Sequence, residues 1–155
     1  DLADKYLLAD DALTGLGFSN YEVSNWAAAG GECRHNLAYW RGAAWWGIGP
    51  GAHSHIGGAR FWNRKHPRSY AAALAAGESP ALAREVLGGQ DRRVERVLLE
   101  LRLADGIPLE ILTATELARV PGIVARGLAS AEGGRLRLTR AGRLLADGVI
   151  RDLLD

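Results

Sequence analysis

The sequence predicts an α/β segment followed by a mainly α, winged-helix-like domain. A helical pattern over residues 1–16 leads directly into a strand pattern over residues 18–26, which is half of a β–α–β unit and indicates a parallel sheet. Near Gly88-Gly89 the composition changes, and the remaining residues are rich in leucine and arginine and contain no aromatic side chain. We therefore expect a first domain over residues 1–77, a linker over 78–90 and a second domain over 91–155.

Hydrophobic periodicity predicts the elements of the first domain. In the first helix, apolar residues recur at steps of three and four, at Leu2, Tyr6, Ala9 and Leu13. In the strand that follows, side chains alternate between two faces, with Tyr21, Val23 and Asn25 on one and Glu22, Ser24 and Trp26 on the other. Further along, the sequence predicts one or two helical turns over 35–41, a short strand over 60–63 and a helix from Pro67 to Gly77.

Several helices are predicted in the second domain. An amphipathic pattern over residues 91–103 is broken at Gly106, and a short helix is expected after the break. Thr113 and Glu116 have the spacing of a capping box, which predicts the start of the next helix. Pro121-Gly122 predicts the start of a third short helix, because proline is favoured in the first helical turn.

A β-hairpin is predicted after these helices. Apolar stretches flank Glu132-Gly133-Gly134, which is typical of a hairpin over residues 128–138. Thr139 then caps a closing helix that is rich in leucine. Helices followed by a hairpin and a closing helix are the arrangement of a winged-helix-like module.

Composition narrows the class of protein. The chain has 155 residues, a formal net charge of +1 and a hydrophobic share of 48%, as expected for a soluble globular protein with no dedicated nucleic-acid surface. No apolar run approaches the roughly 20 residues that span a bilayer. The chain contains no methionine and a single cysteine, Cys33, so we expect a fragment of a longer reading frame, with no internal disulfide, from a reducing cytoplasm.

The first candidate site is the pair Glu22 and Ser24 on the predicted strand. Strand alternation places both side chains on one face, where they would meet polar groups of a ligand if that face points into a barrel. The alternative is a polar strand face in solvent, because alternation does not say which face is buried.

The second candidate site surrounds His35. His35 and Tyr39 are four residues apart, so a helical turn places them on one face. A neutral imidazole is a good ligand for haem iron or another metal, and Cys33 is close enough to offer a thiolate. The alternative is a histidine that only caps or stabilises a loop.

The third candidate site is the glycine loop that contains Gly47, Gly49, Ala52 and Ser54. Glycine has no Cβ, so backbone N–H groups of such a loop could approach an anion or a ribose. His53 and His55 would share a face in a strand, but no third metal ligand is nearby in the sequence.

Aromatic and basic side chains are unevenly distributed. All five tryptophans lie between Trp26 and Trp62, where they would either stack on a flat macrocycle or pack in a core. The arginines of the second domain are spaced among leucines, which favours a solvated surface over a DNA-reading surface.

Three motifs in the first part together resemble the end of the barrel in HemW-type proteins, which are radical S-adenosylmethionine (SAM) relatives of oxygen-independent coproporphyrinogen III oxidase. They are the stretches Tyr21–Ala27, His35–Gly42 and Gly47–Ser54. Leu98–Ile107 and Leu138–Asp147 are similar to the C-terminal domain of the same family. The resemblance implies the last strands and helix of a partial TIM-like (β/α) barrel, followed by a winged-helix-like domain.

The same resemblance implies a function and a set of sites. In HemW-type proteins, a [4Fe–4S] cluster and SAM are bound, and haem is carried to haem-accepting proteins, membrane-associated ones among them. His35, Asn36 and Tyr39 match the family's His-Asn-x-x-Tyr motif and are the candidates for haem contact, with His35 as the candidate iron ligand. The candidates for the SAM and substrate end are Glu22, Ser24, Gly47, Gly49, Ala52, His53 and Ser54.

The resemblance leaves alternatives open. One is the enzyme branch, in which a radical from SAM oxidatively decarboxylates a porphyrinogen, and another is a winged-helix nucleic-acid-binding module. The three cluster cysteines of the family are absent, so this chain alone is expected to be inactive. We expect haem or porphyrin as a partner, no nucleic acid, and leave a dimer open.

Overall fold

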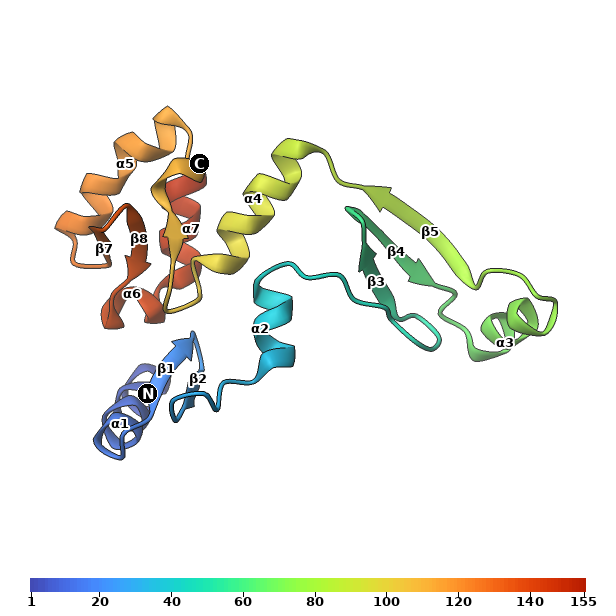
Figure 1. Cartoon of the computed structure of the whole chain (residues 1–155), viewed down its shortest axis with the longest axis horizontal. Coiled ribbons are helices and arrows are strands. Elements are labelled where there is room, and N and C mark those ends of the chain that lie inside the picture. Colours follow the sequence, from blue (N-terminus) through green and yellow to red (C-terminus); the bar gives the residue numbers. More distant parts are fainter. The chain divides into compact units, whose positions relative to one another are not determined.

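The computed structural model describes residues 1–155 and has mixed α/β content, as predicted (Figure 1). The chain divides into two compact units, of which the first comprises Asp1–Arg41 together with Val94–Asp155 and the second Gly42–Arg93. Every strand pair is antiparallel, so the parallel sheet that the helix-to-strand order indicates is not formed within this chain. The strands pair mostly through short hairpins, and tight turns can join only antiparallel strands.

The first helix, α1 (Leu2–Gly15), confirms the prediction for the N-terminal residues. The Asp1 side chain accepts a hydrogen bond from the backbone N–H of Asp4, and the Asp4 side chain accepts one in return, which forms a capping box. The helix ends at Leu16, and Gly17 follows with a φ of 84°.

The single strand predicted over residues 18–26 is instead a hairpin of β1 (Ser19–Glu22) and β2 (Asn25–Ala27). The chain reverses between the two strands because the Asn20 amide ties them together. Its Nδ2 donates to the carbonyl oxygens of Glu22 at 2.6 Å and of Asn25 at 3.2 Å. Alternation along the sequence therefore does not describe the two faces of one strand here.

A short helix, α2 (Arg34–Trp40), confirms the helical turns predicted near His35. The hairpin that precedes it is fastened to the C-terminal part of the same unit. The backbone N–H of Ala104 donates to the carbonyl oxygen of Tyr21 at 3.0 Å, and Glu22 forms an isolated bridge with Leu103. Segments about eighty positions apart in the sequence thus share backbone hydrogen bonds.

The C-terminal residues form helices around a three-stranded sheet with the order β6-β8-β7. The elements are α4 (Gly89–Glu100), β6 (Ile107–Pro108), η1 (Leu109–Ile111), α5 (Ala114–Ala125), β7 (Ala129–Glu132), β8 (Arg135–Leu138), α6 (Arg140–Leu144) and α7 (Ala146–Leu154). The main hydrophobic core lies among them and comprises Val97, Leu101, Ile107, Leu112, Val120, Ile123, Ala129, Leu136, Val149, Ile150 and Leu153.

Most predictions for this region are confirmed. The capping box of Thr113 and Glu116 begins α5, and the predicted hairpin is present with both turn glycines at positive φ. The predicted third helix at Pro121 is wrong, because Pro121 lies inside α5. Proline removes one backbone hydrogen bond, but the buried side chains of Val120 and Ile123 hold the helix against the core on either side. The closing helix is divided into α6 and α7 at Leu145.

The second unit contains a three-stranded sheet with the order β3-β4-β5 and one helix. Its elements are β3 (His53–Ile56), β4 (Ala59–Asn63), α3 (Pro67–Ala75) and β5 (Ala81–Val86). Gly57 and Gly58 join β3 to β4 with φ angles of 60° and 79°, as a tight hairpin turn requires.

Residues 78–90, which the sequence predicts as a linker, contain β5, and this strand pairs with β4. The compact units also group the residues differently from the predicted division, since residues 1–41 belong with the C-terminal residues. The domain boundaries themselves stay a prediction. Each helix is too short or too polar to cross a membrane.

Candidate functional site

His35 and Tyr39 lie on one side of α2, as the four-residue spacing predicts. Their rings meet edge to face, with centroids 4.8 Å apart and planes at 85°. Both side chains are exposed, and Asn36 on the same helix is half-buried. No hydrogen bond engages the His35 imidazole, so its nitrogens are free to bind a ligand. Cys33 precedes the helix as its exposed N-cap residue.

Trp40 ends the same helix and carries an unsatisfied donor. Its Nε1 is buried and has no hydrogen-bond partner. The guanidinium of Arg102 lies over the Trp40 ring at 6.0 Å from the centroid. A buried N–H without an acceptor is costly, so this end of α2 would gain from an acceptor supplied by a ligand or a partner.

Glu22 and Ser24 are brought together at the β1–β2 turn. Glu22 is buried, and its Oε1 accepts hydrogen bonds from Asn25 Nδ2 and, at 3.4 Å, from the Ser24 hydroxyl. Ser24 lies in the turn between β1 and β2, so Glu22 and Ser24 do not share one face of a single strand as predicted. The carboxylate is held by its own turn, which is a structural use of the residue.

The glycine loop is closed by hydrogen bonds within the chain. The N–H of Gly47 donates to Ser54 Oγ at 2.9 Å, and the N–H of Gly49 donates to the Tyr70 hydroxyl at 3.3 Å. The N–H of Ala52 donates to the Gly49 carbonyl oxygen at 3.3 Å. These amides are already satisfied, so in this structure the loop does not offer them to an anion.

Asn63 holds this loop in place, and no sequence motif singles it out. It is 4% exposed, and its Nδ2 donates to the carbonyl oxygens of Gly47 at 3.2 Å and Gly49 at 3.0 Å. Its position at the end of β4, where a polar residue follows two aromatic ones, is the available signal. Gly47 itself requires glycine, because a Cβ there would overlap the carbonyl oxygen of His53.

His53 and Ser54 occupy opposite faces of β3. The His53 ring stacks on Trp62 with centroids 5.8 Å apart, while Ser54 is buried against Gly47. His55 shares the face of His53. No group of three or more histidine, cysteine, aspartate or glutamate side chains is arranged to hold a metal ion.

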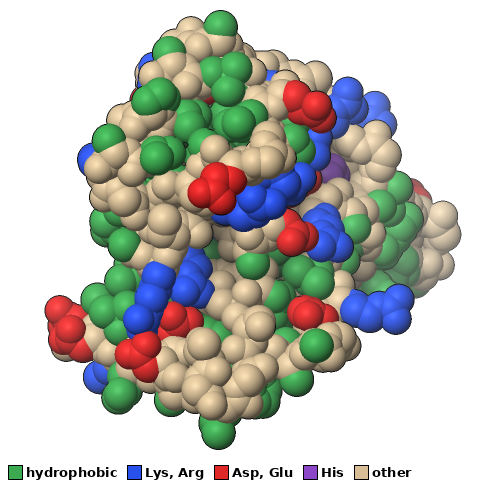
Figure 2. Space-filling model, turned by 60° about the vertical axis from the view of Figure 1, so that its left-hand side comes forward, with side chains coloured by type: hydrophobic (Ala, Val, Ile, Leu, Met, Phe, Trp, Pro, Cys, Tyr) green, Lys and Arg blue, Asp and Glu red, His purple; other side chains and the backbone are tan.

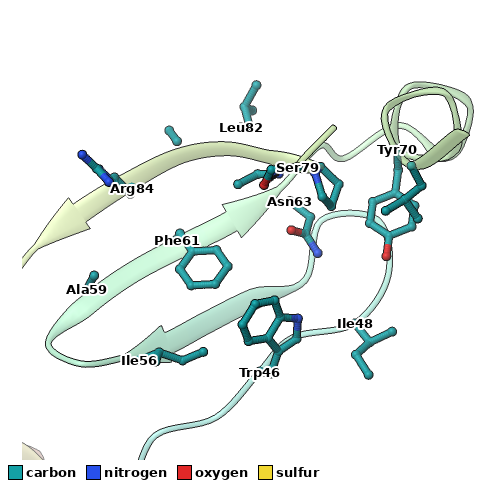
Figure 3. A pocket seen from close by; sticks show the side chains of 14 residues that line it. Trp46, Ile48, Ile56, Ala59, Phe61, Asn63, Tyr70, Ser79, Leu82 and Arg84 are labelled. Atoms are coloured by element: carbon teal, nitrogen blue, oxygen red, sulfur yellow. Dashed lines mark hydrogen bonds between the residues drawn. The ribbon is translucent and has the colours of Figure 1, made fainter. Parts of the chain in front are cut away.

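A cavity of about 720 Å³ lies in the second unit, over the face of the β3-β4-β5 sheet that carries Phe61 (Figure 3). Figure 3 shows Trp46 and Phe61 next to each other at its centre, with the Tyr70 side chain extending from α3. None of its lining residues was a candidate from the sequence motifs. The concentration of all five tryptophans between Trp26 and Trp62 is the only hint in the sequence, and it is compatible both with core packing and with stacking on a macrocycle.

Six arginines of the C-terminal residues make contacts within the chain, and Arg126 and Arg140 are exposed to solvent at the same time. Arg119, Arg135 and Arg137 donate to backbone carbonyl oxygens. Arg126, Arg140 and Arg143 pair with aspartates. Figure 2 shows acidic and basic side chains beside one another on the face that it presents, with no broad patch of one sign. This arrangement favours neither phosphate binding nor base reading.

The predicted site residues are divided between the two units. Glu22 and Ser24 lie at the hairpin turn, and His35 and Tyr39 lie on α2, both in the first unit. The remaining candidates lie in the second unit around the glycine loop: Gly47, Gly49, Ala52, His53 and Ser54.

Comparison with known proteins adds specific relatives, although no protein-family model matches the chain. The chain is 52% identical over 153 residues to heme chaperone HemW from Mycobacterium tuberculosis, which covers 99% of this chain and 39% of that protein. It is 33% identical over 123 residues to heme chaperone HemW from Synechocystis, which covers 76% of this chain and 30% of that protein.

Among solved structures, the fold is similar to that of coproporphyrinogen III oxidase (HemN) from Escherichia coli, which is described as a radical SAM enzyme. The TM-score is 0.71 at 17% identity, over 95% of this chain and 39% of that one. The chain thus spans about two fifths of the length of the Mycobacterium relative and of the HemN structure.

Proposed function

Since this chain is a HemW-type sequence, we propose that it forms part of a haem chaperone, which binds haem and passes it to a haem-accepting protein. The observation that carries the proposal is the 52% identity to a protein named heme chaperone HemW, which extends over 99% of this chain. The aligned region contains 153 of the 155 residues, so it extends across α2 and the glycine loop.

We propose α2 as the haem-contacting element. An exposed imidazole with free nitrogens, as at His35, is suited to donate a lone pair to haem iron. The Tyr39 ring against His35 restricts the orientation of the imidazole, and Asn36 adds a polar side chain on the same helix. The unsatisfied donor of Trp40 supports the proposal that α2 receives a ligand or partner. Bound iron would supply the coordination chemistry that gives haem its characteristic spectrum.

The residues of this chain do not fit a [4Fe–4S] cluster, because the chain has one cysteine and no metal-holding cluster of side chains. In the proposed whole protein, the ligands of the cluster belong to residues outside this sequence. We derive no radical step for the chain itself. The finer description of the fold, a partial radical SAM barrel followed by a winged-helix-like domain, is part of the same proposal.

Each residue proposed for the SAM and substrate end would have a distinct structural role. Ser54, Gly47 and Gly49 would shape the loop, since their hydrogen bonds set its path. His53 presents its ring from β3, while Glu22 and Ser24 hold the first hairpin. Ala52 continues the loop into β3.

The alternative function is oxidative decarboxylation of a porphyrinogen by the whole protein. It is favoured by the similarity of the fold to that of HemN. The named relatives and the His35-Asn36…Tyr39 motif favour the chaperone. A haem-accepting partner belongs to the proposal, and a cytoplasmic location, membrane association and a dimer stay predictions.

A haemin titration tests the proposal. We expect the chain to bind haemin with a shift of the Soret band and His35→Ala to change that spectrum and weaken binding. The matched control is His66→Ala, which removes another exposed histidine that lies outside the candidate sites. If His35→Ala leaves both affinity and spectrum unchanged, His35 is not the iron ligand. If the unsubstituted chain binds no haemin, the chaperone proposal fails for this chain.

A further inference from the structure

Strand register defines one face of the β3-β4-β5 sheet. Ala59, Phe61 and Asn63 alternate along β4 and therefore point to the same side. Ile56 pairs with Ala59, and Arg84 pairs with Phe61, so these side chains share that side. This face lines the cavity in Figure 3.

Large apolar side chains are left in solvent around this cavity. Trp46 is 69% exposed, Ile48 is 86% exposed and Leu82 is 60% exposed. Each of them lines the cavity. Exposed apolar groups that gather around one hollow are typical of a binding site, because scattered exposure is the ordinary case on a protein surface.

Two aromatic rings form the centre of the cavity. Trp46 and Phe61 meet edge to face, with centroids 5.6 Å apart and planes at 78°. The two rings present surfaces at nearly a right angle, so a planar ligand can stack on one and touch the other with its edge (Figure 3).

A single charged residue lines the cavity. The Arg84 side chain is exposed and makes no hydrogen bond or ion pair, whereas the side chain of Arg60, on the opposite face of the sheet, pairs with Glu85 at 2.9 Å. No acidic residue lines the cavity. The lone guanidinium is complementary to an anionic group such as a carboxylate.

Polar groups lie toward α3. The Tyr70 hydroxyl oxygen accepts from the N–H of Gly49, and its own hydrogen has no acceptor in the structure. Tyr70 therefore adds a donor to a cavity that is otherwise mainly apolar. A ligand for this cavity is flat, largely apolar and anionic.

We infer that the cavity on the β3-β4-β5 sheet binds a carboxylate-bearing macrocycle of the porphyrin class through Trp46, Phe61 and Arg84. The cavity volume of about 720 Å³ is in the range of sites that enclose a ligand of several fused or linked rings. The inference rests on the proposed function for the choice of macrocycle. It assigns the recognition of the ring and its carboxylate to residues other than the candidate iron ligand.

The test is a titration of the full chain with iron-free protoporphyrin IX, followed by porphyrin fluorescence and absorbance. We expect saturable binding, which Trp46→Ala weakens by about tenfold or more because a stacking surface is lost. Arg84→Gln should weaken binding of the free acid by about threefold to tenfold and leave binding of the neutral dimethyl ester unchanged. Arg60→Gln, on the opposite face of the sheet, is the matched control and should change neither.

The outcomes separate this inference from the proposed function. Absence of protoporphyrin binding, or binding that is insensitive to both Trp46→Ala and Arg84→Gln, overturns the inference. In that case His35-dependent haemin spectra would still support the proposed function. Conversely, protoporphyrin binding that depends on Trp46 and Arg84 supports the inference even if His35→Ala leaves the haemin spectrum unchanged. Circular dichroism and the thermal midpoint of each variant show whether a loss of binding reflects a loss of fold.

Discussion

Arg143 of α6 forms an ion pair with Asp10 of α1 at 3.2 Å, and both side chains are largely buried, at 15% and 9% exposure. The same carboxylate accepts a hydrogen bond from Trp26 Nε1 at 2.7 Å and pairs with Arg140 Nε at 2.7 Å. A single aspartate therefore connects the first helix, the first hairpin and α6. Because these segments are far apart in the sequence, we expect them to unfold as one cooperative body.

Asp10→Ala should destabilise the chain by about 2–4 kcal/mol. The substitution leaves the Arg143 guanidinium largely buried without its carboxylate and leaves Trp26 Nε1 without its acceptor. Urea denaturation followed by circular dichroism measures the change in the free energy of unfolding.

The matched control for this prediction is Asp11→Ala. Asp11 also pairs with Arg140, at 2.6 Å, but its side chain is 67% exposed. An exposed ion pair contributes little, so this substitution should cost less than about 1 kcal/mol. Equal losses in the free energy of unfolding for the two substitutions would show that the burial of Asp10 does not determine how much its ion pair contributes to stability.

Tyr6 should make the chain sensitive to alkaline pH. Burial raises the pKa of Tyr6 above its ordinary value of 10.0, and the Arg143 guanidinium opposes part of this effect. The folded chain thus holds the phenolic proton to a higher pH than the unfolded chain. The resulting stabilisation is fully present below pH 10.0 and is lost as the pH rises through the folded pKa.

Urea midpoints measured from pH 8 to 11 test the role of Tyr6. We expect Tyr6→Phe to cost about 1 kcal/mol at neutral pH, because the hydroxyl donates to the Val23 carbonyl oxygen at 2.7 Å. The same substitution should flatten the decline in stability above pH 10.0. Tyr21→Phe serves as the control, since the Tyr21 hydroxyl makes no hydrogen bond in the structure. If stability still declines above pH 10.0 in Tyr6→Phe, a group other than Tyr6 causes the decline.

The features predicted well from the sequence are those that local chemistry determines. The capping box that begins α5 involves residues three positions apart, and the glycine pair of the β7–β8 turn supplies the backbone angles that the turn needs. The spacing of His35 and Tyr39 likewise predicts their ring contact on α2.

The features that the sequence missed depend on partners elsewhere in the chain. β5 forms because it can pair with the free edge of β4. Its own residues, Ala81–Val86, have little intrinsic preference for a strand. The β1–β2 turn depends on one asparagine that bonds to two carbonyl oxygens. At the candidate site, the hydrogen bonds of Asn63 arise only when the glycine loop returns to β4, so no local spacing predicts them.

Asn63→Ala should destabilise the second unit by about 2–3 kcal/mol, because two buried carbonyl oxygens, of Gly47 and Gly49, lose their donor. Amide hydrogen exchange should accelerate in the glycine loop. Asn36→Ala is the matched control, because the Asn36 side chain makes no hydrogen bond, and it should stay within about 0.5 kcal/mol of the unsubstituted chain. Unchanged exchange at Gly47 and Gly49 in Asn63→Ala would contradict a loop held by this side chain.

Two glycines near the C-terminus should respond in opposite directions to the same substitution. A Cβ at Gly142 in α6 would overlap the carbonyl oxygen of Leu128, whereas a Cβ at Gly148 in α7 would meet nothing within 4 Å. Gly142→Ala should therefore destabilise the chain by about 1–3 kcal/mol, since the overlap forces α6 away from the segment before β7. Gly148→Ala should stabilise it by up to about 1 kcal/mol, because alanine is the better helix former. Thermal midpoints that move in the same direction for both substitutions would contradict the close approach of α6 to Leu128.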